Sequence, residues 1–259
     1  MSEIVNAKSI YVGEEIMNRK AILLAHKDGE LSSSKDIADV YRFLASLRGG
    51  AWEQGEVYLK ENIRLHELCV LLDEVRNQNI DYVFFYFSGH GGYVRDTEIE
   101  LNPDGERISE RYLSGLATRQ LNIYDCCRSP IPVNFAIDNS MEFLKESSAS
   151  MRECVRKWYN ERVMAAMPQQ MSLYACSRGE CAHDYGKGGV YTQSLLSAVH
   201  ASSEGILLAS QAHAAAYDLT STEVSLRNDE QHPDYFMAKL PGRYQIPIAI
   251  NKNLILEAR

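Results

Sequence analysis

The sequence lacks the features of several large classes of protein. Residues 1–6 show neither the basic region nor the apolar region of a secretory signal peptide, and no apolar run approaches the roughly 20 residues that span a bilayer. The six cysteines are irregularly spaced and two are adjacent, which does not fit a disulfide framework. We therefore expect a cytoplasmic chain with reduced thiols and no association with membranes.

The sequence also has fewer basic than acidic residues. The chain has 27 Lys and Arg residues against 35 Asp and Glu residues, a formal net charge of −8, whereas proteins that bind nucleic acid usually show a basic excess or stripe. We expect no nucleic-acid partner, although an acidic protein attracts basic substrates modestly. With 259 residues, the chain is long enough to bury roughly 70–75% of its unfolded surface, so it needs no disulfide or metal to fold.

What the sequence does contain is a repeated alternation of strand and helix patterns. Short apolar runs predict strands, and apolar residues at helical spacing predict helices between them. The predicted strands cover 21–25, 56–59, 82–87, 120–124 and 171–175, and the helices between the first four cover 37–47, 65–75 and about 108–116. This order predicts an α/β fold with a mostly parallel central sheet of about six strands and helices on both faces.

The remaining segments complete one predicted domain over 1–259. Residues 93–101 suggest a hairpin closed by the turn at 102–105, and a long helix is expected from about 139 to 166. Two more helices near 190–200 and 206–220 and a closing tail at 244–250 follow. We expect residues 1–19 to be an N-terminal lead and residues 130–168 to be an insertion.

Two strand ends carry residues suited to chemistry. The strand at 82–87 runs into Ser-Gly-His-Gly-Gly at 88–92, and the strand at 120–124 runs into Asp-Cys-Cys-Arg-Ser at 125–129. The carboxyl ends of parallel strands face one crevice, so the two loops should meet there. A thiol and an imidazole that meet are the parts of a cysteine nucleophile and its acid/base partner, and the N–H groups of Gly91 and Cys127 could hold the oxyanion. Taken singly, each motif also fits an ordinary turn or core packing.

The order of these two motifs resembles the caspase and metacaspase clan of cysteine peptidases. The pattern Asp-x-Cys-x-Ser is closer to metacaspases and their bacterial relatives than to true caspases. Weaker matches are Glu30-Leu31 with Asp36, the segment 173–177 followed by Glu180, and the segment 188–192 that leads into 195–196. The resemblance covers about residues 20–200 and implies a caspase-like α/β/α sandwich.

The resemblance assigns roles to individual residues. It implies that Cys127, which precedes the Arg of the motif, is the nucleophile rather than Cys126, and that His90 is the acid/base. It also implies that Asp125, Ser88 and Asp36 line the pocket for the residue before the scissile bond. Two carboxylates favour Arg or Lys there. Asp36 also fits an ordinary acid in the first turn of a helix, and Asp125 also fits a satisfied carboxylate at a strand end.

These roles predict a cysteine endopeptidase that cleaves protein substrates after Arg or Lys through an acyl-enzyme, of the kind that acts in bacterial defence or regulated cell death. We expect a zymogen that depends on self-cleavage within 141–168 or on an activating protein or protease. One alternative is a catalytically silent adaptor that binds a partner through 130–168. Another is a thiol-dependent acyl transferase or amidase.

No cofactor and no metal site are expected. Cys176, Cys181 and His183 have a spacing that zinc ligands can show, but no fourth ligand accompanies them. A group of acids follows His90, in a region near which some metacaspases bind calcium, and a solvated hairpin face explains it more simply, with calcium as the alternative. These acids are Asp96, Glu98, Glu100, Asp104 and Glu106.

Overall fold

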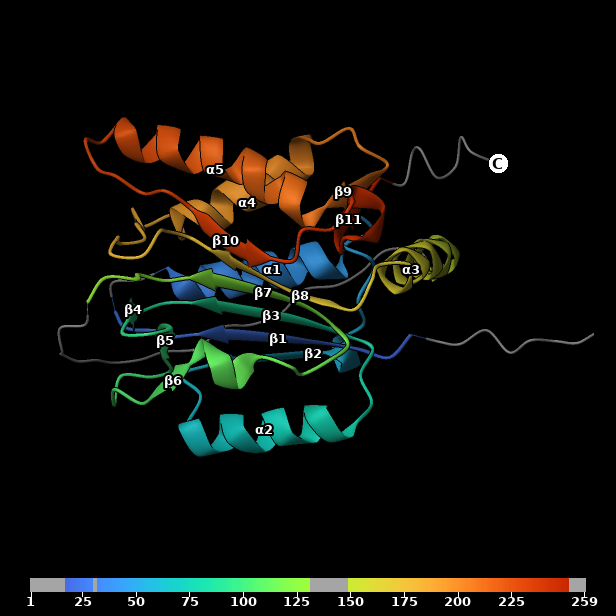
Figure 1. Cartoon of the computed structure of the whole chain (residues 1–259), viewed down its shortest axis with the longest axis horizontal. Helices are drawn as coiled ribbons and strands as arrows, with labels where there is room; N and C mark the ends of the chain where they lie inside the picture. Colours follow the sequence, from blue (N-terminus) through green and yellow to red (C-terminus); the bar gives the residue numbers. More distant parts are fainter. Residues whose placement is uncertain (1–16, 30–31, 131–148, 252–259) are drawn as a thin grey trace, which may run out of the picture.

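The computed structural model describes residues 17–29, 32–130 and 149–251. Its centre is a six-stranded sheet in the order β10-β8-β7-β3-β1-β2, in which only β10 runs antiparallel to its neighbour (Figure 1). The strands are β1 (Arg19–Ala25), β2 (Val57–Glu61), β3 (Tyr82–Ser88), β7 (Arg119–Asp125), β8 (Gln169–Tyr174) and β10 (Asp234–Met237). The prediction of a mostly parallel sheet of about six strands is confirmed.

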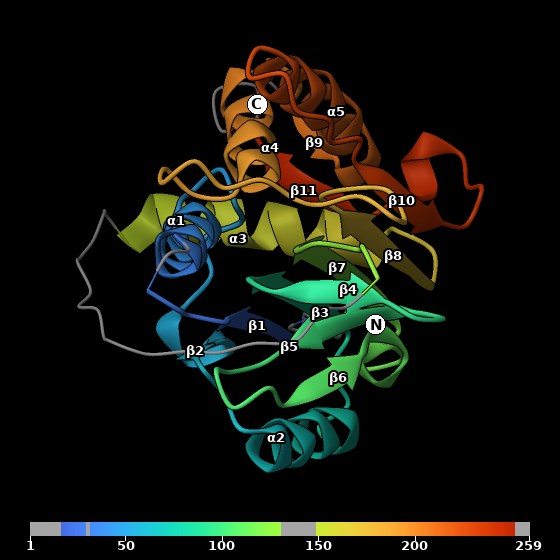
Figure 2. The ribbon, with the colours of Figure 1, turned by 90° about the vertical axis from the view of Figure 1, so that its left-hand side faces the viewer.

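Helices cover both faces of this sheet. Figure 2 shows α2 (Leu65–Asn77) alone on one side, while the other side carries α1 (Ser33–Ala45), α3 (Ala149–Met164), α4 (Val190–Ala201) and α5 (Ala209–Ser225). The chain is therefore a three-layer α/β/α sandwich, as expected. Among the described residues, none of the helices combines the length and apolarity that crossing a bilayer requires.

The central position of β3 follows from its sequence. Phe84 and Tyr86 pack into the apolar cluster beneath α1 and α4, whereas Val83, Phe85 and Phe87 pack into the cluster beneath α2. A strand of a parallel sheet with apolar side chains on both faces is typical of a sheet that helices cover on both sides. The unbroken apolar run at 82–87 therefore sets the middle of the sandwich.

Several expected elements differ in the structure. Residues 206–208 form a strand, β9 (Ile206–Leu208), rather than the start of a helix, because they pair with the distant β11 (Pro247–Ile250). The expected hairpin at 93–101 is a three-stranded antiparallel sheet of β4 (Gly91–Tyr93), β5 (Thr97–Glu100) and β6 (Arg107–Ser109). The expected helix near 108–116 is a single 3-10 turn over Glu110–Leu113.

Three predicted features reach residues outside the described ranges. Most of the N-terminal lead at 1–19 lies there, as do residues 131–148 of the insertion at 130–168. The part of the predicted helix at 139–166 that is described is α3, which begins at Ala149. The segment 141–168, expected to be cut, is therefore described only from residue 149 onward.

Candidate active site

The two motif-bearing loops emerge side by side. β3 and β7 are parallel neighbours, and their last residues, Ser88 and Asp125, are register partners. The ladder continues one step further, because the N–H of Gly89 donates to the carbonyl of Asp125 at 3.1 Å. Figure 2 looks onto this edge, where β4–β6 extend past the sheet. The structure thus places the His and Cys loops at one edge, as the sequence predicts.

Gly89 turns the chain away from the end of β3. Its φ of +146° lies in a region that favours glycine, and a Cβ there would lie 2.6 Å from the Cβ of His26. The turn leaves His90 partly exposed, with its Nε2 paired to the carboxylate of Asp28 and its ring 4.9 Å, edge-on, from the ring of His26. His26 is buried, with Nδ1 3.2 Å from the carbonyl of Glu100; burial and the neighbouring His90 lower its pKa.

The two adjacent cysteines have different environments. Cys126 is 1% exposed and lies so close to Gly91 that a Cβ on that glycine would be 2.7 Å from Sγ, so Cys126 is a core residue. Cys127 begins the loop and is partly exposed, with Sγ 3.7 Å from the carbonyl of Ala182. Burial, with a smaller contribution from the neighbouring Cys181 thiol, raises the pKa of Cys127 to about 12. The thiol is therefore protonated at neutral pH.

The thiol and the imidazole do not contact each other through a hydrogen bond. Within the described residues, Sγ of Cys127 bonds to Ala182, and the imidazole of His90 bonds to Asp28. The expected pair of residues is present at one edge of the sheet, but each member is engaged elsewhere. The contact with Asp28 uses only Nε2 of His90, so a dyad requires the ring to come within hydrogen-bonding distance of the Cys127 thiol through either ring nitrogen.

The backbone N–H of Gly91 does not take part in the small sheet. Gly91 is opposite Ile99, and the flanking bond runs from the N–H of Glu100 to the carbonyl of His90 at 3.0 Å. This arrangement marks Gly91 and Ile99 as a pair that exchanges no hydrogen bonds. The N–H of Gly91 therefore points away from β5.

That N–H points toward the loop of Cys127. Tyr93 presents its N–H at the same edge of β4 as Gly91 does. The N–H of Tyr93 donates to the carbonyl of Ser129 at 3.1 Å. Among the described residues, the N–H of Cys127 has no backbone acceptor. The lack of a backbone acceptor is compatible with the oxyanion role expected of these two N–H groups.

Asp36 and Asp125 form a buried pair of acids beside this loop. Asp36 lies in the first turn of α1 and accepts hydrogen bonds from Ser88 Oγ at 2.8 Å, from the N–H of Gly189 at 2.9 Å and from Gln193 Nε2 at 3.1 Å. Asp36 is fully buried, with 0% of its surface exposed. Burial and the charge of Asp125 raise the pKa of Asp36 to about 8.

The second acid has its own donors. Oδ2 of Asp125 accepts from the N–H and the Oγ1 of Thr192, at 2.9 and 2.6 Å. Burial raises the pKa of Asp125 to about 6. Gly188 and Gly189 lie directly on the two acids, since a Cβ on either glycine would collide with a carboxylate. The structure thus gathers Asp36, Ser88 and Asp125, and a loop closes over them.

Arg128 holds the Cys loop against the sheet. Its guanidinium is buried, lies 3.9 Å from the ring centroid of Tyr174 and forms an ion pair with Asp234 at 2.9 Å. Asp234 begins β10, the strand that sequence reasoning missed. The run Asp-Tyr-Phe-Met is short, and Tyr235 and Phe236 are exposed, so it shows no burial pattern. Pairing with β8 decides its structure.

Other contacts of the site also went unpredicted. Asp28 holds His90, His26 packs against it, and Gln193 bonds to Asp36. Thr192, the donor to Asp125, falls within the matched segment 188–192, which was a usable signal. The contacts of Asp28 and His26 join segments more than 60 residues apart, and no local pattern reports such contacts.

Three of these side chains could hold a metal ion. His26, Asp28 and His90 offer ligand atoms that all lie within 4.8 Å of one another. Imidazole and carboxylate ligands suit a transition metal better than calcium. By contrast, Cys176 bonds to backbone carbonyls and Cys181 bonds to Ser129, so these thiols do not gather with His183 around one point.

Most acids of the region after His90 have protein partners. Glu100 pairs with Arg107, Asp104 pairs with Arg64, and Glu106 accepts from Asn102 Nδ2 and from the N–H of Leu65. The remaining two, Asp96 and Glu98, lie near Ser109.

Taken together, the fold and the site define an α/β/α protein that presents a thiol and an imidazole from adjacent parallel strands, the arrangement of a cysteine hydrolase. A family model described as the caspase domain matches residues 18–247, and the chain belongs to this family of cysteine peptidases, whose members act on protein substrates. The resemblance drawn from the two motifs is thereby confirmed. A search of curated proteins finds no match.

Proposed function

We propose that this chain is a cysteine endopeptidase that cleaves protein substrates after Arg or Lys, with Cys127 as nucleophile and His90 as acid/base. The observation that carries the specificity is the pair of buried acids, Asp36 and Asp125, joined by Ser88 at the end of β3. Among the described residues, neither carboxylate has a cationic partner. A guanidinium or ammonium from a substrate supplies the missing charge.

The proposed reaction uses the groups of the two loops. Cys127 gives its proton to His90 and attacks the carbonyl carbon of the scissile bond, while the N–H groups of Gly91 and Cys127 hold the oxyanion. His90 then protonates the leaving amine, and water, deprotonated by His90, releases the acyl group from sulfur.

The structure corresponds to a latent form in this proposal. His90 contacts Asp28, the Cys127 thiol bonds to the carbonyl of Ala182 rather than to His90, and Gly188 and Gly189 cover the two acids. Binding of a cationic side chain requires this glycine loop to move. This agrees with a zymogen that an activating protein, a protease or self-cleavage converts to the active form.

Self-cleavage is best placed before α3. A peptidase binds its substrate in extended form, and the described basic residues of α3 are helical and engaged: Arg152 donates to the carbonyl of Ala45, and Arg156 pairs with Glu56. This leaves Lys145 as the favoured site within 141–168. Intact-mass measurement on the wild type and on Cys127→Ala tests it: the wild type should split near Lys145, whereas identical masses would remove self-cleavage from the proposal.

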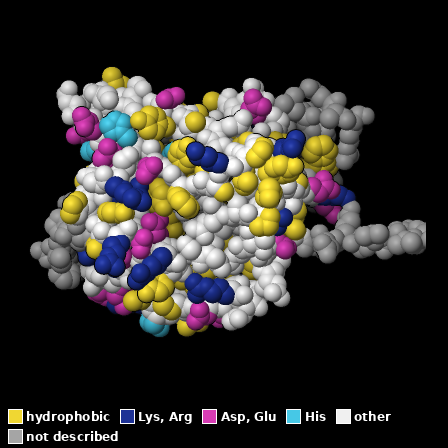
Figure 3. All heavy atoms as spheres, viewed as in Figure 1, with side chains coloured by type: hydrophobic (Ala, Val, Ile, Leu, Met, Phe, Trp, Pro, Cys, Tyr) yellow, Lys and Arg dark blue, Asp and Glu magenta, His cyan; other side chains and the backbone are white. Residues whose placement is uncertain are grey.

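The metacaspase-like motifs support a bacterial-type enzyme of defence or regulated cell death, in the cytoplasm and without an obligate cofactor, calcium remaining the alternative. On the face shown in Figure 3, Lys and Arg side chains are interspersed with Asp and Glu rather than gathered in a stripe. This supports the expectation that nucleic acid is not a partner.

Peptide reporters that end in Arg, Lys or Asp test the central proposal. Cys127→Ala and His90→Ala should each abolish cleavage after Arg, whereas Cys126→Ala, which alters only a core thiol, should retain most of it. Loss of activity in Cys126→Ala with a native unfolding temperature would show that the nucleophile is misassigned. A preference for Asp-ending reporters would overturn the role of the acids. A wild type that labels at Cys127 with a thiol electrophile but cleaves no reporter would favour the acyl transferase or amidase, whereas one that neither labels nor cleaves would favour the silent adaptor.

A further inference from the structure

The loop that follows β8 runs antiparallel to the Cys127 loop. The N–H of Arg128 donates to the carbonyl of Glu180 at 2.9 Å, and the N–H of Gly179 donates to the carbonyl of Arg128 at 2.9 Å. These two hydrogen bonds match an antiparallel pair of segments. Gly179 and Glu180 together lie opposite Arg128, so the segment after β8 has one extra residue. Extended by one residue, this pairing would place Cys127 opposite Cys181.

The side chains agree with this backbone pairing. Cys181 Sγ lies 3.7 Å from Ser129 Oγ, and Cys127 Sγ lies 3.7 Å from the carbonyl of Ala182. Residues 127 and 129 project to the same side of an extended segment, so both thiols occupy one side of the pair. The Cys181 thiol is also close enough to contribute to the raised pKa of Cys127.

The pairing suits a disulfide. Residues directly opposite in an antiparallel pair have Cα atoms about 4.5–5.5 Å apart, within the range of about 4.4–6.8 Å that disulfides accept. Cys181 is exposed, so a small oxidant reaches it from solvent, whereas Cys126 and Cys176 are buried. Gly179, with open space around its Cα, adjoins this segment and allows it to adapt.

We propose that Cys127 and Cys181 form a reversible disulfide when the protein meets a peroxide, and that Cys181 is therefore a redox modification site beside the candidate nucleophile. The peroxide oxidises the Cys181 thiol to a sulfenic acid and is itself reduced to water. The sulfur of Cys127 then attacks the sulfur of Cys181, the S–O bond breaks, the S–S bond forms and a second water leaves. A thiol reductant restores both cysteines.

The consequence for activity rests on the proposed function. If Cys127 is the nucleophile, the disulfide blocks it and also protects it from irreversible oxidation to the sulfinic acid. The protein would then be silent under oxidising conditions and recover after reduction. Formation of the disulfide itself does not depend on peptidase activity.

Mass mapping of peroxide-treated protein under non-reducing conditions tests the pair. The wild type should yield a cross-linked peptide that joins Cys127 to Cys181, about 2 Da lighter than the sum of its reduced parts, and this species should disappear on reduction. Cys181→Ser should yield none. Cys69→Ser is the matched control, because Cys69 is another exposed cysteine, on α2, and its removal should leave the cross-link unchanged.

Activity after peroxide and then reduction gives the second readout. Wild type and Cys69→Ser should recover most cleavage of an Arg-ending reporter, and Cys181→Ser should recover less than about one tenth because its Cys127 is over-oxidised. Absence of the cross-link in the wild type, or equal recovery in Cys181→Ser, overturns the inference. A cross-link in a protein whose reduced form cleaves no reporter supports the cysteine pair and contradicts the proposed function.

Discussion

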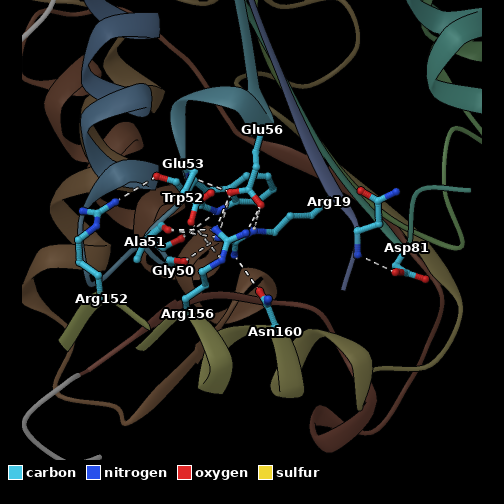
Figure 4. A network of polar contacts seen from close by, with 12 residues as sticks. Arg19, Gly50, Ala51, Trp52, Glu53, Glu56, Asp81, Arg152, Arg156 and Asn160 are labelled. Atoms are coloured by element: carbon cyan, nitrogen blue, oxygen red, sulfur yellow. Dashed lines mark hydrogen bonds and ion pairs between the residues drawn. The ribbon is translucent and has the colours of Figure 1, made fainter. Parts of the chain in front are cut away.

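Two buried clusters of charged residues lie at opposite ends of the parallel strands, and they are built differently. At the amino end, the guanidinium of Arg19 bonds to Glu56 at 3.2 Å and to Asn160 at 2.9 Å, and lies 4.3 Å from the centroid of Trp52 (Figure 4). Arg156 pairs with the same Glu56. At the carboxyl end, Asp36 and Asp125 face each other without a cation among the described residues.

The difference separates a cluster whose charges are paired from one whose acids lack a cationic partner among the described residues. Arg19 and Arg156 lower the pKa of Glu56 against the opposing effect of burial, so the cluster is a satisfied ionic contact that ties η1 (Gln54–Glu56) and α3 to β1. Two like charges in a buried site oppose folding unless one is neutralised. Protonation of Asp36, whose pKa is raised to about 8, neutralises one acid at neutral pH, and in the proposed function a cationic substrate side chain would do so instead.

The largest expected effect comes from the acids. Asp36→Asn and Asp125→Asn should each lower kcat/KM for an Arg-ending reporter on the order of 10²–10³-fold, because a buried charge partner of the substrate is lost. Above about pH 8, where both acids are charged, the unfolding temperature of each variant should be unchanged or higher, since the like-charge pair is removed. An equal loss on an uncharged reporter would contradict the pocket assignment.

Glu56→Gln should lower stability and leave activity nearly unchanged, the reverse of the effect expected for the Asp36 and Asp125 variants. Removing one partner of a buried ion pair leaves Arg19 uncompensated and should lower the free energy of unfolding by about 3–5 kcal/mol, measured in urea. The kcat/KM of the folded fraction should stay within about twofold of the wild type. A change in reporter preference without loss of stability would contradict the assignment of the Glu56 cluster to stability alone.

The pH dependence of stability sharpens the contrast further. Folding raises the pKa of Asp36 from 3.8 to about 8, so the folded state binds more protons than the unfolded state between these values. The contribution of Asp36 to the free energy of unfolding should therefore be complete below about pH 4. It should be lost as the pH rises toward 8, by up to about 1.4 kcal/mol per pH unit. Urea unfolding of wild type and Asp36→Asn across this range measures the slope, which the variant should flatten. Matching slopes would show that Asp36 ionises normally.

The smallest effect is expected at Asp28. Asp28→Asn should weaken the contact that holds His90 and free the imidazole to approach Cys127, so alkylation of Cys127 by iodoacetamide should accelerate about two- to fivefold. Peptide mapping identifies the labelled thiol, and Cys69 in the same sample serves as the internal control. Slower labelling of Cys127 would show that Asp28 supports, rather than restrains, the pair.

Much of this architecture could be predicted from local sequence. The apolar run at 82–87 predicts a strand covered on both faces, and the motifs at 88–92 and 125–129 directly follow strands, which places them at one edge of a parallel sheet. The family resemblance also chose Cys127 over Cys126, and the structure buries Cys126 in the core and leaves Cys127 partly exposed in the loop. Short elements such as β9 and β10 were not predictable, since three or four residues carry too little periodicity.

The sequence by itself thus determined the layer order, the edge at which the two motifs lie and the family resemblance, because burial periodicity and motif spacing are local properties of the chain. Only the tertiary structure decided that His90 contacts Asp28, that Gly188 and Gly189 cover Asp36 and Asp125, and that the Cys181 thiol contacts Ser129 of the Cys127 loop. Each of these contacts joins segments distant in sequence, and their energies depend on burial and charge that exist only once the layers have packed.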